Sequence, residues 1–219
     1  MNEITNKHYA LIPAKSKSSR CIDKNWRDFV LGENLVSYLI SIIPEDFFDS
    51  VILSTDKPDV KNYDGVTIHF RNKTLATKES PVNDLIDVII DEYELSNESC
   101  IWLLNPTSPF REPKDFINIK QMLEREDISS IISVSETNSF IWRDERPLFN
   151  TDYPRKNTQD FEVNYYIENG QFYVFRVVEF LKNKTWYSNS TFIYKQKGIK
   201  TCIDIDTEED FLDAQKIAR

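Results

Sequence analysis

The 219-residue sequence predicts an α/β protein in which a mostly parallel sheet has helices on both faces and carries a small antiparallel excursion. Short apolar runs rich in Val and Ile recur over the first 135 residues, which is typical of strands buried on both faces. Amphipathic helical patterns separate these runs, as crossover connections between parallel strands require. After residue 136 the runs alternate or become aromatic, which is typical of antiparallel strands.

Five apolar runs predict the strands of the parallel part. They are bounded by polar or turn-forming residues, and they lie at 9–14, 50–55, 66–70, 100–105 and 129–135. Strand propensity and these boundaries together favour a buried sheet over isolated loops. After the excursion, the chain is expected to return to the sheet in the run "KTCIDID" at 200–206.

The clearest helix is predicted at 80–95, where apolar residues recur at the spacing of one helical face. Ser80 is expected to cap this helix and Pro81 to occupy its first turn. A last helix is expected to be capped by Thr207. The three further helices are predicted at 33–43, 113–124 and 208–218.

The length indicates one sizeable domain rather than two, so a single domain over 1–219 is expected. No internal repeat, low-complexity tract or linker divides the sequence. The excursion at about 137–196 is expected to form a lobe or a dimer contact. Its aromatic run "NYYIENGQFYVF" either serves that contact or fills the core of the lobe itself.

The formal net charge of −9 and the pI near 4.9 argue against a nucleic-acid or anionic-membrane partner. No apolar run approaches the length of a membrane span, and the first residues lack the pattern of a secretory signal, so a cytoplasmic location is expected. Cys21, Cys100 and Cys202 share no CxxC spacing and are expected to be reduced thiols.

Several catalytic and nucleotide-binding motifs are absent from the sequence. The four glycines exclude both GxGxxG and the Walker loop. GxSxG and HExxH do not occur either. His8 and His69 lie in or beside predicted strands and are expected to be structural.

A basic loop follows the first predicted strand. Residues 13–27 contain five basic residues and one acid. Ligands of open α/β sheets bind at the carboxyl ends of strands, so this loop is placed to hold phosphates. Ser16, Ser18 and Ser19 add hydroxyl donors. A solvated basic turn remains the alternative.

Two carboxylates stand near the end of the chain, in "CIDIDTEEDF". In a strand, Asp204 and Asp206 share one face and Ile203 and Ile205 the other. Adjacent carboxylates repel each other unless a cation lies between them, and Mg²⁺ prefers such oxygen ligands together with water and phosphate. The alternative is a solvent-facing edge in which Asp206 helps to start the last helix.

A third motif, "LLNPTSPFR", follows the fourth predicted strand. Its two prolines stiffen the backbone, and its polar side chains are suited to a hydroxylated ligand. A simple turn between strand and helix is the alternative.

Taken in order, these motifs resemble the acylneuraminate (sialic acid type) cytidylyltransferases and the related CMP-KDO synthetases, over nearly the whole chain. The resemblance implies a Rossmann-like nucleotidyltransferase fold of the GT-A type. It also implies transfer of CMP from CTP to the anomeric hydroxyl of a sialic, legionaminic, pseudaminic or KDO-type 2-keto sugar acid, with release of pyrophosphate, for lipopolysaccharide or capsule biosynthesis. The motifs that carry it are "LIPAKSKSSRCIDKN", "VILSTD", "RNKTLAT", "LLNPTSPFR", "SSIISVSE", "PRKNTQ", "YIENGQFYVF" and "CIDIDTEEDF".

The resemblance also implies roles for individual residues. Lys24, Asp204 and Asp206 are expected to be catalytic, with Mg²⁺ held by the two aspartates. A homodimer formed through the excursion is expected. The nucleotide-binding residues are expected to be Lys15, Ser18, Ser19, Arg20, Lys24, Asn25, Arg71 and Ser80. The sugar-binding residues are expected to be Asn105, Thr107, Ser108, Arg155 and Gln159.

The sequence departs from the family pattern at a few of these positions. Lys15 stands where Arg is usual, which replaces a two-pronged phosphate contact by a point charge. Ser16 and Lys17 replace a glycine pair of the sialic branch, and Asn105 stands where that branch has Gln. Two alternatives therefore stay open: a nucleotidyltransferase with another nucleotide or sugar, and a nucleotide-binding homologue with impaired catalysis.

Overall fold

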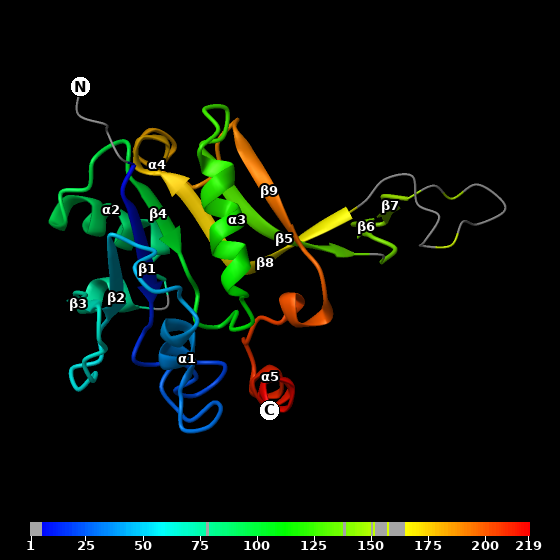
Figure 1. Cartoon of the computed structure of the whole chain (residues 1–219). Coiled ribbons are helices and arrows are strands. Elements are labelled where there is room, and N and C mark those ends of the chain that lie inside the picture. The colour runs from blue at the N-terminus through cyan, green and yellow to red at the C-terminus, as the bar shows by residue number, and fades with distance from the viewer. Residues whose placement is uncertain (1–5, 78, 138, 150, 152–156, 158–164) are drawn as a thin grey trace.

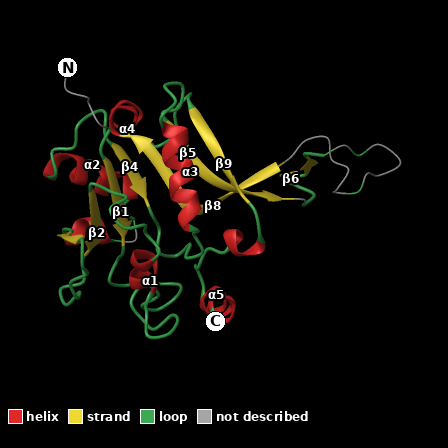
Figure 2. Ribbon diagram, viewed as in Figure 1, coloured by secondary structure: helices red, strands yellow, loops and turns green. Residues whose placement is uncertain are grey.

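A computed structural model describes residues 6–77, 79–137, 139–149, 151, 157 and 165–219. Its centre is a seven-stranded sheet with the order β3-β2-β1-β4-β8-β5-β9. Six of these strands run parallel to one another, and β8 runs antiparallel to both of its neighbours, β4 and β5. The prediction of a mostly parallel α/β sheet is confirmed (Figure 2).

The strands predicted for the first 135 residues are all present. The strands of the sheet are β1 (His8–Pro13), β2 (Ser50–Thr55), β3 (Val66–Phe70), β4 (Cys100–Leu103), β5 (Ser130–Thr137), β8 (Tyr165–Arg176) and β9 (Thr191–Gln196). A separate two-stranded ladder is formed by β6 (Trp142–Arg143) and β7 (Arg146–Pro147). Figure 1 shows this ladder beyond the ends of β5 and β8, to one side of the sheet.

Helices cover both faces of the sheet because successive strand residues point to opposite sides. On one face Ala10 and Ile12 pack with α1 and α3, and on the other Leu11 packs with α2 and α4. A third apolar cluster holds α5 against the segment that precedes α1. The helices are α1 (Leu35–Ser41), α2 (Val82–Glu92), α3 (Pro113–Leu123), α4 (Val177–Asn183) and α5 (Glu208–Ala218), with short 3-10 turns η1 (Lys73–Ala76) and η3 (Ile199–Cys202).

Two local predictions are wrong. Helix α2 begins at Val82 with Pro81 as its N-cap residue and no side-chain cap, because the Ser80 hydroxyl instead contacts Thr77 Oγ1 at 2.7 Å and the carbonyl of Thr74. The run at 200–206 is not a strand of the sheet. It forms η3 and then continues outside any strand, with Ile205 N donating to Thr107 O at 2.8 Å.

The excursion contributes to the main sheet. Strand β8 lies between β4 and β5, and its rings Phe172 and Phe175 are fully buried in the two central cores. These rings therefore fill the core rather than a surface. All three cysteines are free thiols, as predicted. Within the described residues, no helix has the length and apolar character needed to cross a membrane.

Candidate active site

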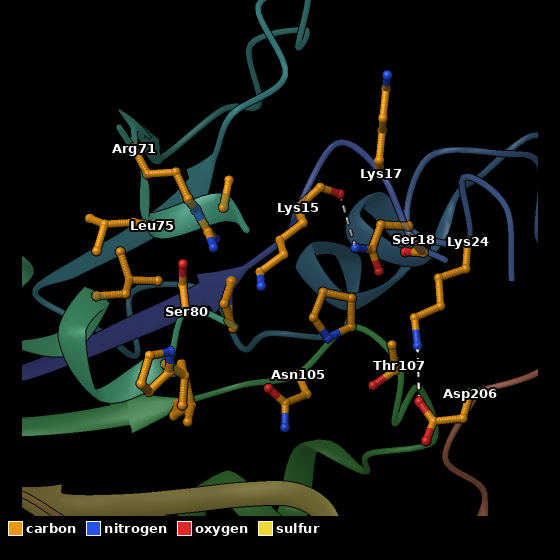
Figure 3. A pocket seen from close by; sticks show the side chains of 18 of the residues that line it. Lys15, Lys17, Ser18, Lys24, Arg71, Leu75, Ser80, Asn105, Thr107 and Asp206 are labelled. Carbon is orange, nitrogen blue, oxygen red and sulfur yellow. Dashed lines mark hydrogen bonds and ion pairs between the residues drawn. The ribbon is translucent and has the colours of Figure 1, made fainter. Parts of the chain in front are cut away.

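The candidate site lies where four parallel strands end. Strands β1, β2, β3 and β4 are paired in parallel, so their carboxyl ends meet at one edge of the sheet, where α/β proteins bind ligands. A cavity of about 810 Å³ opens there (Figure 3). The predicted site residues that line it are Lys15, Ser18, Ser19, Arg20, Lys24, Asn25, Arg71, Ser80, Asn105, Thr107 and Asp206.

The basic loop (residues 15–25) is folded back on itself at the end of β1. The carbonyl of Lys15 accepts hydrogen bonds from Trp26 Nε1 at 2.9 Å and from Asn25 Nδ2 at 3.4 Å. At the end of β2, Asp56 accepts from Ser16 N at 2.7 Å and from Ser16 Oγ at 2.5 Å. Burial raises the pKa of Asp56, but the bonds from Ser16 outweigh it and lower that pKa. The loop is therefore anchored both by its own Asn25 and by Trp26 and Asp56 outside it.

Cations of the basic loop point into the cavity. Figure 3 shows Lys15 and Lys24 directed inward, whereas Lys17 points away. The Nζ atom of Lys15 donates to the carbonyl of Thr77 at 2.5 Å. Burial and the neighbouring Arg71 lower the pKa of Lys15. The positive charges of Lys15 and Arg71 thus stand close enough to affect each other, which favours an anion at this place.

Asp206 faces the basic loop from the other end of the chain. Its Oδ1 atom accepts from Arg20 Nη2 at 2.9 Å and from Lys24 Nζ at 3.3 Å. Lys24 also donates to the carbonyl of Ile205 at 2.5 Å. The basic loop and the segment that contains Asp206 therefore meet at the cavity.

Asp204 is held beneath β8 rather than against the basic loop. Its Oδ1 atom accepts from Ser108 Oγ at 3.2 Å. A Cβ on Gly170 would lie 2.6 Å from Ser108 Oγ and 4.0 Å from Asp204 Cγ. Ser108 was expected to contact the sugar acid, but its side chain is fully buried, so this expectation is corrected. Neither Ser108 nor Asp204 is among the described residues that line the cavity.

The carboxylates of Asp204 and Asp206 offer the oxygen ligands that Mg²⁺ prefers. The segment is extended from Ile203 to Asp206, and Ile205 is fully buried while Asp204 is exposed and Asp206 partly exposed. No group of three or more His, Cys, Asp or Glu side chains suited to a metal occurs in the described part of the chain. Two carboxylates are enough only if water and substrate phosphate complete the shell, which is the usual arrangement for Mg²⁺.

The opposite end of the cavity is formed by Arg71, Leu75 and Ser80 (Figure 3). Arg71 follows β3, is 6% exposed and donates through Nη2 to the carbonyl of Ser54. Burial lowers the pKa of Arg71 to about 10, so the guanidinium stays charged at neutral pH. Its buried Nε atom has no hydrogen-bond partner among the described residues. The buried Arg71 guanidinium is therefore placed to donate a hydrogen bond to a polar group of a ligand at this end of the cavity.

The floor between the two ends comes from the loop after β4, where Asn105 and Thr107 face the cavity. Arg111 fixes this loop from below. It donates to the carbonyls of Gln171 and Ser108 at 2.6 Å and of Asn105 at 2.9 Å. The other two expected sugar contacts, Arg155 and Gln159, lie outside the described residues.

An aromatic wall of the cavity was not predicted from the sequence. Tyr173 and Trp186 line the cavity, with ring centroids 5.2 Å apart. Burial and the neighbouring Glu168 raise the pKa of Tyr173 well above its ordinary value, so its phenol is neutral. Tyr173 reaches the site because β8 pairs with β4, opposite Leu103. Alternation of side chains along β8 could have indicated on which face of the sheet Tyr173 lies. No pattern in the sequence indicates that Trp186 lines the cavity.

The cavity therefore combines three kinds of surface. A cationic loop and Asp206 lie at one end, a buried guanidinium lies at the other, and a polar floor with an aromatic wall lies between them. Such an arrangement can hold a long anion that carries a polar planar group at one end and can bring a second, hydroxylated molecule against it.

Comparisons with known proteins agree with this geometry. A family model described as cytidylyltransferase matches residues 9–217. The chain is 27% identical over 227 residues to CMP-N,N'-diacetyllegionaminic acid synthase of Legionella pneumophila, covering 95% of this chain and 94% of that protein. It is 26% identical to N-acylneuraminate cytidylyltransferase of Escherichia coli O18:K1:H7, over 92% of this chain and 50% of that protein. A solved structure of CMP:2-keto-3-deoxy-manno-octonic acid synthetase complexed with CTP has the same fold, with a TM-score of 0.65 and 16% identity over 97% of this chain and 98% of that one.

Proposed function

Because the chain belongs to the cytidylyltransferase family, we propose that it transfers CMP from CTP to the anomeric hydroxyl of a 2-keto sugar acid. The observation that carries the proposal is the cavity in which Lys24 of the basic loop meets Asp206 at 3.3 Å, opposite the buried Arg71. The relatives that match over most of this chain are named for CMP-legionaminic acid synthesis and for acylneuraminate cytidylyl transfer, which supports an acceptor of the sialic acid type.

In the proposed reaction, the anomeric oxygen forms a bond to the α-phosphorus of CTP. The bond from that phosphorus to the bridging oxygen breaks, its electron pair leaves with pyrophosphate, and the hydroxyl proton passes to solvent. Transfer of this kind depends mainly on positioning and on neutralising charge. Lys15, Arg20 and Lys24 supply positive charge for the triphosphate, and Ser18 and Ser19 supply hydroxyl donors.

The two ends of the cavity suggest how each substrate lies. The cytidine is assigned to the end with Arg71 and Ser80, where Arg71 Nε is buried without a partner among the described residues. Asn25, in the basic loop, remains an expected contact to the nucleotide. The sugar acid is assigned to the floor at Asn105 and Thr107, between the triphosphate and the aromatic wall. Arg155 and Gln159 remain expected contacts to this sugar acid.

Mg²⁺ is assigned to Asp204 and Asp206, whose carboxylates would hold it. When bound, the ion neutralises phosphate charge and stabilises the charge that develops on the transferring group. Arg20 and Lys24 now share Asp206. Arg20 can turn from Asp206 to phosphate oxygens, because an exposed ion pair of this type contributes only ~0–1 kcal/mol. Lys24 is only 14% exposed, and its longer contact of 3.3 Å with Asp206 is the one that phosphate would replace.

The direct test is pyrophosphate release from CTP and Mg²⁺ with a panel of sialic, legionaminic, pseudaminic and KDO-type acids. Release is expected only when CTP, the divalent ion and one of these acids are all present. No release with any of them would contradict the proposal. A panel of nucleoside triphosphates separates it from transfer of another nucleotide.

The alternative of a non-catalytic homologue has one observation in its favour. Lys15, which replaces the usual Arg, donates to the Thr77 carbonyl rather than standing free in the cavity. Calorimetric binding of CTP without product from any acceptor would favour this alternative.

We also propose a homodimer formed through the excursion. The ladder of β6 and β7 lies apart from the sheet, and Trp142 on it is 57% exposed (Figure 1). Large exposed rings of this kind are common at interfaces. Sedimentation should give the mass of two chains, and a single-chain mass would contradict it. A role in surface-polysaccharide biosynthesis remains an expectation from the resemblance, and a cytoplasmic location remains an expectation from the sequence.

A further inference from the structure

Two layers of contact join the basic loop, and Arg27 just after it, to the acidic segment (residues 204–208). The inner pairs link Asp206 to Arg20 at 2.9 Å and to Lys24 at 3.3 Å. The outer pair links Arg27 Nη2 to Glu208 Oε1 at 2.9 Å. The outer pair lies two residues beyond Asp206 on one side and three beyond Lys24 on the other.

The inner pairs have other partners in the proposed reaction. Arg20 and Lys24 turn to the triphosphate, and Asp206 turns to Mg²⁺. The side chains of Arg20 and Asp206 are 68% and 41% exposed, so their mutual attraction is weakened by water. Once substrate is bound, the inner pairs no longer fix the spacing between the basic loop and the acidic segment.

The outer pair has no such competing role, since neither residue lines the cavity. The Arg27 guanidinium lies 3.7 Å from the centroid of the Phe211 ring, which is buried in α5. Its Nη2 atom also donates to the Sγ atom of Cys21, at 3.4 Å, and Cys21 does line the cavity. Stacking on an aromatic face and pairing with a carboxylate use the planar geometry that distinguishes Arg from Lys.

Glu208 completes the connection from the other side. It is the first residue of α5, where a carboxylate is favoured by the helix dipole. Its Oε2 atom lies 3.7 Å from the Sγ atom of Cys21. Arg27, Glu208 and Cys21 therefore form a closed triangle that joins the basic loop, the segment before α1 and the start of α5.

We propose that Arg27 and Glu208 are positioning residues that hold the basic loop and Asp206 in register while the inner pairs exchange their partners for CTP and Mg²⁺. This inference rests on the proposed function. Misplacement of a catalytic group by an ångström can reduce a rate by about a hundredfold. The outer pair thus acts on the reaction without touching either substrate.

The test compares Glu208→Gln and Arg27→Met with wild type. Each variant should weaken CTP binding in the presence of Mg²⁺ by about tenfold, which is ~1.4 kcal/mol. Where turnover is measurable, kcat should also fall while KM for the sugar acid stays within about twofold of wild type. Arg27→Lys, which keeps the charge but not the planar fork, should recover part of the loss.

Asp213→Asn is the matched control. Asp213 also lies on α5 and pairs with Lys216 at 2.8 Å, yet neither residue lines the cavity or contacts the basic loop. This variant should bind CTP like wild type. If Arg27→Met does not fold, Arg27→Lys and Glu208→Gln carry the comparison alone.

The outcomes separate this inference from the proposed function. If wild type binds CTP but no acceptor gives product, the proposed transfer fails, while the calorimetric affinities of the variants still decide the role of the outer pair. If Glu208→Gln and Arg27→Lys lower the melting temperature but keep wild-type CTP affinity and kcat, the outer pair is merely structural and the inference is overturned. If wild type does not bind CTP, both are overturned.

Discussion

Asp206 is the residue whose carboxylate pairs with the cations of the site. A single oxygen atom accepts from both Arg20 and Lys24, and the side chain is 41% exposed. Asp206→Asn removes the negative charge but keeps the shape. Turnover is expected to fall by about a thousandfold or more, since charge stabilisation at the transferring group is lost.

Stability should respond little to Asp206→Asn, because exposed ion pairs contribute ~0–1 kcal/mol. Pyrophosphate release and thermal unfolding, measured on the same samples, check both parts. Asp213→Asn serves again as the control on α5. Wild-type turnover in Asp206→Asn would remove the proposed role of Asp206 with Mg²⁺.

A buried histidine far from the cavity controls stability in acid. His8 is 6% exposed, and its Nδ1 atom accepts from Trp102 Nε1 at 3.0 Å. Burial, together with the smaller effects of Lys120 and Arg176, lowers the pKa of His8 from 6.5 to about 4, although Asp49 acts in the opposite direction. Below pH 6.5 the unfolded chain therefore binds a proton that the folded chain excludes. Stability from this group is complete at neutral pH and is lost as the pH falls towards 4.

The expected size of this effect is about 2 kcal/mol of unfolding free energy between pH 7 and pH 5. His8→Asn keeps an acceptor near Trp102 and cannot titrate. The variant should therefore lose about 2 kcal/mol less than wild type over the same interval. Urea unfolding at the two pH values measures the difference. Equal losses in the two proteins would contradict the assignment of this pH dependence to His8.

At the residue scale, charge was the most informative part of the sequence. The cations of the basic loop and Asp206 were predicted as site residues because they are charged groups near strand ends, where α/β proteins bind ligands. The expected sugar contact of Ser108 is wrong, because its hydroxyl is buried and donates to Asp204 at 3.2 Å. Neither hydrophobicity nor spacing distinguishes a buried serine from an exposed one in the same turn.

The irregular part of β8 lies beside Asp204 of the acidic segment. Pairing with β5 shifts from Ile132–Tyr173 to Val134–Glu168, so β8 carries extra residues between these positions. Gly170 lies within this stretch with φ of +71°, in the left-handed region. Bulges of this kind turn a strand locally, and glycine is the residue that tolerates the backbone.

Gly170→Ala is expected to damage both stability and activity. The positive φ costs ~1 kcal/mol, and a Cβ placed 2.6 Å from Ser108 Oγ must displace that side chain and Asp204 with it. Gly65→Ala is the matched control, because Gly65 has φ of +68° and nothing within 4 Å of an added Cβ. Unfolding should show a loss in both variants, and pyrophosphate release should fall only in Gly170→Ala. Equal activity in the two variants would contradict the coupling.

At the element scale, local periodicity predicted the strands and helices that packing later confirmed, such as Glu208–Ala218 with its Thr207 cap. Periodicity carried no information on which strands become neighbours. The insertion of β8 between β4 and β5 joins residues about 70 positions apart, as in Leu103–Tyr173. The alternation at 200–206 predicts a strand, but its first residues form η3, and Ile205 N donates to Thr107 in the loop after β4 rather than to a strand of the sheet.

The whole molecule gathers the two ends of its sequence around one cavity. The cavity lining runs from Pro13 to Asp206, although the chain as a whole has a net charge of −9. The order of motifs predicted most of this lining, because the carboxyl ends of parallel strands share an edge. The aromatic wall of Tyr173 and Trp186 depends on the position of an antiparallel strand, so it followed only from the structure.

A ligand that fills this cavity should stabilise the entire fold, because it contacts the basic loop and the acidic segment together and has no comparable site in the unfolded chain. CTP with Mg²⁺ at about 100 times its Kd should add ~2.7 kcal/mol to the unfolding free energy. For a chain of this length that corresponds to a rise of about 5–10 °C in Tm. CMP at the same concentration lacks the two outer phosphates that the cations of the basic loop are placed to bind, so it should give a much smaller rise. Thermal unfolding with each nucleotide measures the difference. An equal rise with CMP and CTP would mean that the cations of the basic loop do not bind the triphosphate.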